Sequence, residues 1–315
     1  MKYLGIDLGG INVAAAVVDE RGTILASSKR ATPRGAEAVA DAMAQTGRQA
    51  AERAGCALED LACVGIGSPG TIDPVAGVVE YWSNLDFRHV PLAAMLTERL
   101  GRPVLLENDA NAAALGEYAA GAGRGSASMV AITLGTGVGG GAILGGKLYT
   151  GFNYAGMEVG HFVIEHNGRL CTCGRRGCFE TYASATALIH RTRARMEENR
   201  ESLIWTLVEG DPRRVEGRTA FDAAAQGDLL ARELVEEYRS YLACGITSLI
   251  NIFQPEVFCV GGGVAGAGET LLAPVREILA REDYARNSPR RTKLVLAQLG
   301  NDAGIIGAAL LPLFR

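Results

Sequence analysis

The residues with the clearest chemical potential are one histidine and three cysteines between positions 161 and 178. His161, Cys171, Cys173 and Cys178 lie in the segment EVGHFVIEHNGRLCTCGRRGCFE, which covers residues 158–180. One imidazole and three thiolates suit a closed, tetrahedral structural zinc site. Packing cysteines, or a disulfide with a free thiol, are the alternatives, but three cysteines within eight residues favour a metal in a reducing compartment. The sequence therefore predicts one bound zinc ion, with His166 as an alternative ligand.

A carboxylate that could move a proton lies in the segment Glu107-Asn108-Asp109-Ala110, which follows an expected strand at residues 103–106. An acid at the end of a strand that enters a cleft is well placed to accept a hydroxyl proton. A plain helix cap at the start of an expected helix over 109–120 is the competing interpretation. The residues alone leave both open.

Two glycine turns could bind phosphate. Asp7-Leu8-Gly9-Gly10 and Leu134-Gly135-Thr136-Gly137 each follow an apolar strand and precede an antiparallel one. Backbone amides at such turns can cradle phosphates, and Asp7 would then hold a magnesium ion, through water. Glycines that merely permit tight hairpins are the alternative. The repetition of the turn in both halves of the chain favours phosphate.

The spacing Gly-x-Gly-x-x-Gly occurs three times, starting at Gly65, Gly135 and Gly261. A dinucleotide site needs a strand before the glycines, a helix after them, and an acid about 20 residues further on. None of the three fits all of these requirements. Residues 141–147 have the spacing of a phosphate loop, but Leu148 replaces the required Ser or Thr. The glycine spacing is therefore only weak evidence for a dinucleotide site, and the sequence excludes the phosphate loop.

The elements that must position these residues alternate between strands and helices. Strands are expected at residues 3–8, 13–18, 62–67, 129–134 and 257–263, and helices at 35–54, 109–120, 228–253, 269–280 and 304–313. Such alternation is typical of an α/β chain. We expect the last helix to pack back on the first domain.

Composition narrows the class of protein. The 315 residues are 48% hydrophobic and 21% charged, with a net charge of -4. A buried core is feasible, and no cationic cluster points to nucleic acid. An acid at position 7 argues against a signal peptide, and no apolar run is long enough for a membrane span. We expect a cytoplasmic protein with neither a nucleic-acid nor a membrane partner.

The two turns, together with Val260-Gly261-Gly262-Gly263, resemble the phosphate and adenosine turns of the superfamily that joins actin, heat-shock ATPases and hexokinase. Glu-x-Gly-His followed by Cys-x-Cys-Gly-x-x-Gly-Cys-x-Glu resembles the signature of the repressor–ORF–kinase (ROK) family, and residues 181–186 resemble its glucokinase branch. The resemblance implies two RNase H-like α/β domains with a nucleotide and sugar cleft between them. We place the smaller domain at 1–110 plus 300–315 and the larger at 111–299.

The resemblance also implies an ATP-dependent glucokinase that uses Mg²⁺. Asp109 would be the general base, while sugar contacts would come from Gly70, Asn84, Asn108, Asp109, Glu158, His161 and Glu180. ATP would meet Asp7, Gly9, Gly10, Thr136, Gly137, Gly261, Gly262 and Gly263. His161 would bind zinc through one ring nitrogen and a sugar hydroxyl through the other.

The sequence departs from the family in the first phosphate turn, where Ile11 replaces the usual threonine. A kinase for another hexose, such as N-acetylmannosamine, N-acetylglucosamine or fructose, is an alternative. A non-catalytic sugar-sensing protein is a second one, which we disfavour because family repressors carry a helix-turn-helix domain before the first strand. For the assembly we expect a homodimer or a higher homo-oligomer.

Overall fold

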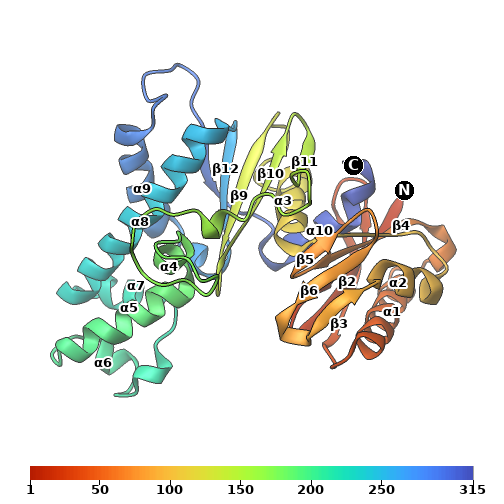
Figure 1. The fold of residues 1–315 in the computed structure, drawn as a ribbon, viewed down its shortest axis with the longest axis horizontal. Helices are drawn as coiled ribbons and strands as arrows, with labels where there is room; N and C mark the ends of the chain where they lie inside the picture. Colours follow the sequence, from red (N-terminus) through yellow and green to blue (C-terminus); the bar gives the residue numbers. More distant parts are fainter. Residues whose placement is uncertain (315) are drawn as a thin grey trace. The chain divides into compact units, whose positions relative to one another are not determined.

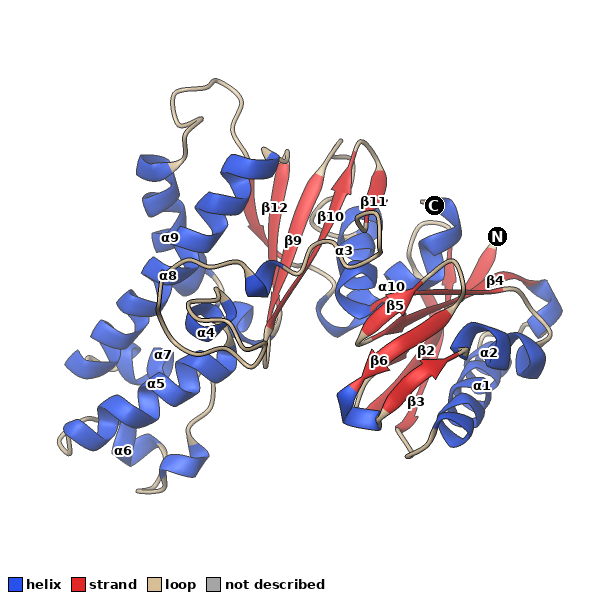
Figure 2. Cartoon of the chain, viewed as in Figure 1, coloured by secondary structure: helices blue, strands red, loops and turns tan. Residues whose placement is uncertain are grey.

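The computed structural model describes residues 1–314, and the chain divides into two compact α/β units (Figures 1 and 2). The first unit comprises Met1–Ala131, Gly140–Met157 and the segment that begins at Gln298. The second comprises Ile132–Gly139 and Glu158–Ala297. No helix among the described residues is both long and apolar enough to cross a bilayer.

A five-stranded sheet forms the centre of the first unit, in the order β3-β2-β1-β4-β8. Its strands are β1 (Lys2–Leu8), β2 (Asn12–Asp19), β3 (Ile24–Ala31), β4 (Leu61–Ser68) and β8 (Val104–Asn108). The expected hairpin is present, because β1 and β2 pair antiparallel from Leu8↔Val13 to Lys2↔Asp19. β4 runs parallel to both β1 and β8. The carboxyl ends of β1, β4 and β8 therefore meet at one edge.

Helices cover both faces of this sheet. α1 (Ala36–Arg53) and α2 (Leu92–Leu100) share a buried core with alternate residues of β1, among them Leu4 and Ile6. α10 (Ala303–Leu310) packs on the other face with Tyr3, Ala16 and Val18. The last helix thus returns to the first unit, as the sequence predicts.

α10 lies unusually close to its neighbours. A Cβ atom at Gly65 of β4 would be 1.8 Å from the Ala308 carbonyl oxygen, and one at Gly307 would be 1.7 Å from that of Ala112 in α3 (Asp109–Ala120). Since α3 packs on α10 in this way, α3 belongs to the first unit. This unit therefore extends past the expected boundary at residue 110.

A small antiparallel sheet in the first unit has no counterpart in the sequence-based expectations. It contains β5 (Thr71–Asp73), β6 (Val78–Trp82) and β7 (Phe87–Val90). A 3₁₀ turn at Ser83–Leu85 joins β6 to β7 and carries Asn84.

The second five-stranded sheet has the order β11-β10-β9-β12-β13. Its strands are β9 (Met129–Leu134), β10 (Val138–Leu144), β11 (Lys147–Tyr149), β12 (Val257–Gly261) and β13 (Lys293–Leu296). β9 and β10 contribute residues to both units. The strand–turn–strand repeat inferred from the sequence is thus present in both sheets.

The helices of the second unit are α4 (Glu180–Ala183), α5 (Ala185–Glu198), α6 (Ile204–Leu207), α7 (Thr219–Ala225), α8 (Leu229–Phe253) and α9 (Glu269–Glu282). Asp228 caps α8 by accepting a hydrogen bond from the Ala231 amide. The helix ends at Phe253, two residues before Pro255, because the residue that precedes a proline is disfavoured in a helix.

Candidate functional site

Two acids of the first unit meet at the carboxyl edge of its sheet. Asp7, the last residue but one of β1, is in register with Gly67 of β4, and Gly67 is in register with Glu107 of β8. A Cβ atom at Gly67 would lie 3.7 Å from the Cα of Asp109 and 4.0 Å from Oδ1 of Asp7. The fold therefore brings the expected base and the expected magnesium ligand to one place.

Their surroundings make both carboxyl groups more basic than usual. Burial, followed by the charge of Asp109, raises the pKa of Asp7 to about 6, against the opposing effect of Lys29. Burial also raises the pKa of Asp109, although its amide hydrogen bond from Ala110 acts in the other direction. A carboxylate with a raised pKa accepts a proton more readily near neutral pH.

The sequence left open whether Asp109 only caps the helix that follows it; in the structure the N-cap residue is Asn108. The Asn108 Oδ1 accepts hydrogen bonds from the amides of Ala110 at 2.9 Å and Asn111 at 3.2 Å. Its Nδ2 donates to the Gly70 carbonyl at 3.4 Å. Because the cap is a neighbouring side chain, the Asp109 carboxylate is not required for that purpose.

The first glycine turn lies beside the sugar-site candidates of its own unit. A Cβ atom at Gly10 would be 3.7 Å from Nδ2 of Asn84. The Gly9 amide donates to the Asn12 carbonyl at 2.9 Å, so Gly9 itself has no free N–H. The amides of Gly10 and Ile11 have no acceptor among residues 1–314, and the Ile11 side chain is 80% exposed. The turn thus offers fewer amides than the sequence implied.

The second turn has the same internal closure. The Gly135 amide donates to the Gly137 carbonyl at 3.0 Å, while Thr136 is exposed. Next to the turn, the Val138 amide donates to Oε2 of Glu180 at 3.0 Å. The structure therefore joins Thr136, Gly137 and Glu180 in one small region of the second unit.

The cysteine and histidine cluster has the geometry of a metal site. The ligand atoms of His161, Cys171, Cys173 and Cys178 all lie within 4.8 Å of one another. Cys171 Sγ is 3.7 Å from His161 Nδ1, and Cys173 Sγ is 3.6 Å from Cys178 Sγ. Zn–S bonds of about 2.3 Å place two tetrahedral sulfur ligands about 3.8 Å apart. These four residues therefore fit a zinc ion.

Burial and neighbouring groups also change the acidity of the thiols, because the amide of Arg175 lowers the pKa of Cys173 while that of Cys178 is raised. Burial and the neighbouring thiols raise the pKa of Cys178 to about 12, which keeps it protonated at neutral pH unless a positive charge is bound. On the other side of the cluster, Cys171 Sγ lies 3.9 Å from Oε1 of Glu180. The cluster is thus connected to the region around the second turn.

His161 ends a short 3₁₀ helix, Val159–His161, that follows Glu158. The His161 amide donates to the Glu158 carbonyl at 3.0 Å, and the Glu158 side chain is exposed. Since Nδ1 of His161 faces the sulfur atoms, Nε2 is the ring nitrogen left for another contact.

The third glycine turn borders a cavity of about 1030 Å³. Gly261 ends β12, and Gly262 has a φ of 87°, where a Cβ atom would be 2.4 Å from the Leu134 amide nitrogen. Gly263 then opens a 3₁₀ segment, Gly263–Ala267, that lines the cavity. The cavity is as large as the largest common ligand pockets.

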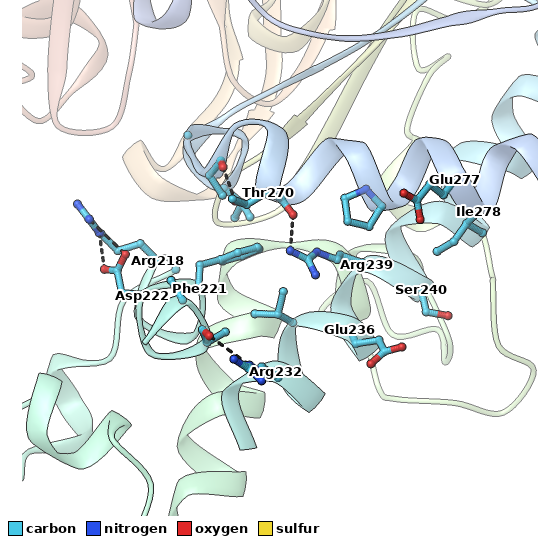
Figure 3. Close-up of a pocket in the computed structure, with 18 of the residues that line it drawn as sticks. Arg218, Phe221, Asp222, Arg232, Glu236, Arg239, Ser240, Thr270, Glu277 and Ile278 are labelled. Atoms are coloured by element: carbon cyan, nitrogen blue, oxygen red, sulfur yellow. Dashed lines mark hydrogen bonds and ion pairs between the residues drawn. The ribbon is translucent and has the colours of Figure 1, made fainter. Parts of the chain in front are cut away.

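Residues that no motif indicated form the rest of this cavity. Figure 3 shows Phe221 of α7 and Arg239 of α8 facing α9, with Arg239 donating to the Thr270 carbonyl. They lie 20 to 40 residues from the glycine turn in sequence, so only the packing of α7, α8 and α9 reveals them.

Comparison with known proteins agrees with this architecture. The sequence matches the ROK family over residues 3–313. It is 42% identical to a glucokinase from Thermotoga maritima, covering 98% of this chain and 96% of that one, and 40% identical to a glucokinase from Streptomyces coelicolor, covering 97% and 96%. The crystal structure of a ROK family glucokinase from Streptomyces griseus, in complex with glucose and AMPPNP, matches with a TM-score of 0.83 and 40% identity, over 99% of both chains. The chain belongs to the ROK family.

Proposed function

We propose that this protein phosphorylates glucose with ATP to give glucose 6-phosphate. The observation that carries the proposal is the half-buried Asp109 carboxylate next to Asp7, at the edge where β1, β4 and β8 end. Relatives named glucokinase, about 40% identical over nearly the whole chain, support glucose as the acceptor. The relative that holds glucose and AMPPNP supports ATP as the donor.

The nucleotide is held by backbone groups. The free amides of Gly10 in the first turn, and of Thr136 and Gly137 in the second, donate to phosphate oxygens. The adenosine moiety occupies the cavity beside Gly261, Gly262 and Gly263, where Phe221 and Val264 supply apolar surface. Asp7 is the protein group that holds Mg²⁺, which neutralises phosphate charge when bound.

Seven residues bind the sugar, six through polar side chains and Gly70 through its backbone. They are Gly70, Asn84, Asn108, Asp109, Glu158, His161 and Glu180. Each can accept or donate a hydrogen bond to a hydroxyl group. The Asn108 Oδ1 is already used by the cap, so its Nδ2 is the group that donates to the sugar.

In the reaction, the Asp109 carboxylate removes the proton from the 6-hydroxyl of glucose as that oxygen attacks the γ-phosphorus atom. The new O–P bond forms while the bond from phosphorus to the β–γ bridging oxygen breaks, and ADP leaves. The raised pKa of Asp109 matches this task. A zinc ion at the cysteine cluster would orient His161 and the region of Glu180 without taking part in the transfer.

The acceptor and the product can be tested directly. Purified protein, incubated with MgATP and a panel of hexoses, should release ADP fastest with glucose, and phosphorus NMR should identify the 6-phosphate ester. N-acetylmannosamine, N-acetylglucosamine and fructose serve as the competing acceptors. Turnover of one of these without turnover of glucose would contradict the proposed acceptor.

Asp109→Asn should lower kcat by about 10²- to 10⁴-fold, because the amide cannot take the proton. Glucose affinity should change little, since the amide retains the shape and a hydrogen bond. Asp228→Asn is the matched control, because it alters a buried aspartate whose role is structural: it accepts hydrogen bonds from the amides of Ala231 and Leu203. More than half of the wild-type rate in Asp109→Asn would show that Asp109 is not the base.

One zinc ion per chain should be found by elemental analysis of protein purified without added metal. Cys173→Ser should remove it and lower the melting temperature by about 5 °C or more, because the closed ligand set is broken. Cys244→Ser, at another exposed cysteine, is the control and should keep both zinc and stability. A Cys173→Ser protein with unchanged zinc content and melting temperature would refute the site.

Ile11→Thr should raise kcat/KM for ATP by about 3- to 10-fold, because the new hydroxyl can donate to a phosphate oxygen. Ile11 is exposed rather than packed in the core, so the melting temperature should stay the same. Ile252→Thr, at a 70% exposed isoleucine of α8, is the control for the change in side chain. Unchanged ATP kinetics in Ile11→Thr would show that this side chain does not reach the phosphates.

A further inference from the structure

The first phosphate turn is held from one side by a residue that no sequence motif indicated. Thr32, directly after β3, donates its Oγ1 hydroxyl to the Gly9 carbonyl at 2.7 Å. The Thr32 amide donates to the Ile11 carbonyl at 2.9 Å. The carbonyls of Gly9 and Ile11 therefore both point toward Thr32.

These bonds fix the direction of an amide that Thr32 does not touch. Within one planar trans peptide, the carbonyl of Gly9 and the N–H of Gly10 point to opposite sides. With the carbonyl held by Thr32, the Gly10 N–H must point away from β3. That N–H has no acceptor among the described residues, so it is available to a ligand.

The anchor itself is rigid. β3 pairs with β2 up to Asn12↔Ala31, so the sheet holds the residue that precedes Thr32. Pro33 follows Thr32, and a residue before proline is restricted to extended backbone. Thr32 is half-buried, and its hydroxyl is directed at the turn by both constraints.

The second turn has an equivalent anchor. The Gly135 carbonyl accepts a hydrogen bond from the Ala185 amide at 2.8 Å, at the start of α5. Gly135 corresponds to Gly9, because each is the first glycine of its turn and donates its own amide back within the turn. In each turn the carbonyl oxygen of the corresponding glycine therefore accepts a hydrogen bond: from the Thr32 side chain in the first turn and from the Ala185 backbone amide in the second.

We infer that Thr32 is a positioning residue for ATP: its hydroxyl fixes the Gly9–Gly10 peptide so that the Gly10 N–H is aimed at the phosphates. The inference rests on the proposed kinase function. Two successive glycines are otherwise free to rotate, and ordering them on binding would weaken affinity. The hydroxyl removes that freedom before ATP arrives.

The test compares Thr32→Val with Thr32→Ser. Valine keeps the branched shape and the bond from the amide to Ile11 but loses the hydroxyl, whereas serine keeps the hydroxyl. Thr32→Val should raise the KM for ATP, and the Kd for AMPPNP measured by calorimetry, by about 3- to 10-fold. The KM for glucose should stay within twofold, and Thr32→Ser should resemble the wild type.

Thr292→Val is the matched control. The Thr292 hydroxyl also donates to a loop carbonyl, that of Pro255, at 2.7 Å and in a half-buried setting, but it lies far along the chain from both turns. It should lower stability to a similar degree without changing the KM for ATP. If Thr32→Val does not fold, Thr32→Ala removes the same bond with less steric demand.

An ATP KM within twofold of the wild type in Thr32→Val would overturn the inference, as would equal losses in Thr32→Val and Thr32→Ser. A parallel rise in the KM values for ATP and glucose would mean that Thr32 only stabilises the unit. The wild-type assay separates this outcome from failure of the proposed function. If the wild type transfers no phosphate from ATP to any hexose, the proposed function fails; if it does and Thr32→Val is unaffected, only the role of Thr32 fails.

Discussion

The backbone of α10 approaches β4 and α3 more closely than any side chain would allow. At Gly65 and Gly307 a Cβ atom would lie within 1.8 Å of a carbonyl oxygen of the facing helix. This contact fixes α3 against the sheet, and α3 begins with Asp109. The same helix carries Gly304, where a Cβ atom would be 3.5 Å from the Asp7 carboxylate. The relative position of the two acids therefore depends on glycines that carry no chemistry of their own, and a larger residue at either contact would displace Asp109.

The two glycine turns show how hydrogen bonds can fix the direction of flexible backbone groups. Each turn uses its first glycine amide internally and presents the amides that follow. Hydrogen bonds to the turn carbonyls decide where those amides point, because each peptide is planar. In the second unit the neighbours of the turn also include Glu180, which accepts from the Val138 amide and lies next to the cysteine cluster. The second turn and the cysteine cluster are thus linked through short, directly contacting segments rather than through the core.

Much of this could be predicted from the sequence. The predicted ROK family and the two-domain α/β fold are confirmed, and apolar runs ending in glycine located the strands of both hairpins. The cysteine spacing identified four residues that do converge, because ligands so near in sequence need little help from the fold.

The small sheet over residues 71–90 was not predicted, since its three- to five-residue strands have no clear period. The cavity residues Phe221 and Arg239, and the bond from Thr32 to Gly9, could not be predicted either, because each depends on packing between distant segments. The roles of individual site residues stay predictions.

The electrostatics of the first unit indicate why such a site needs its ligands. Loss of water around the two half-buried carboxyl groups is the main reason that the pKa values of Asp7 and Asp109 are raised, and the charge of Asp109 raises that of Asp7 further. A carboxyl group whose pKa is higher in the folded than in the unfolded chain binds more protons when folded. Its contribution therefore lowers stability as the pH rises from the unfolded value near 4 through the folded value of about 6 for Asp7. At neutral pH the ionised form of Asp7 is therefore unfavourable in the folded chain, and either a proton or a cation would stabilise this edge of the sheet. In the proposed reaction a magnesium ion at Asp7 would lower the pKa of that acid, which would leave Asp109 as the group that accepts a proton.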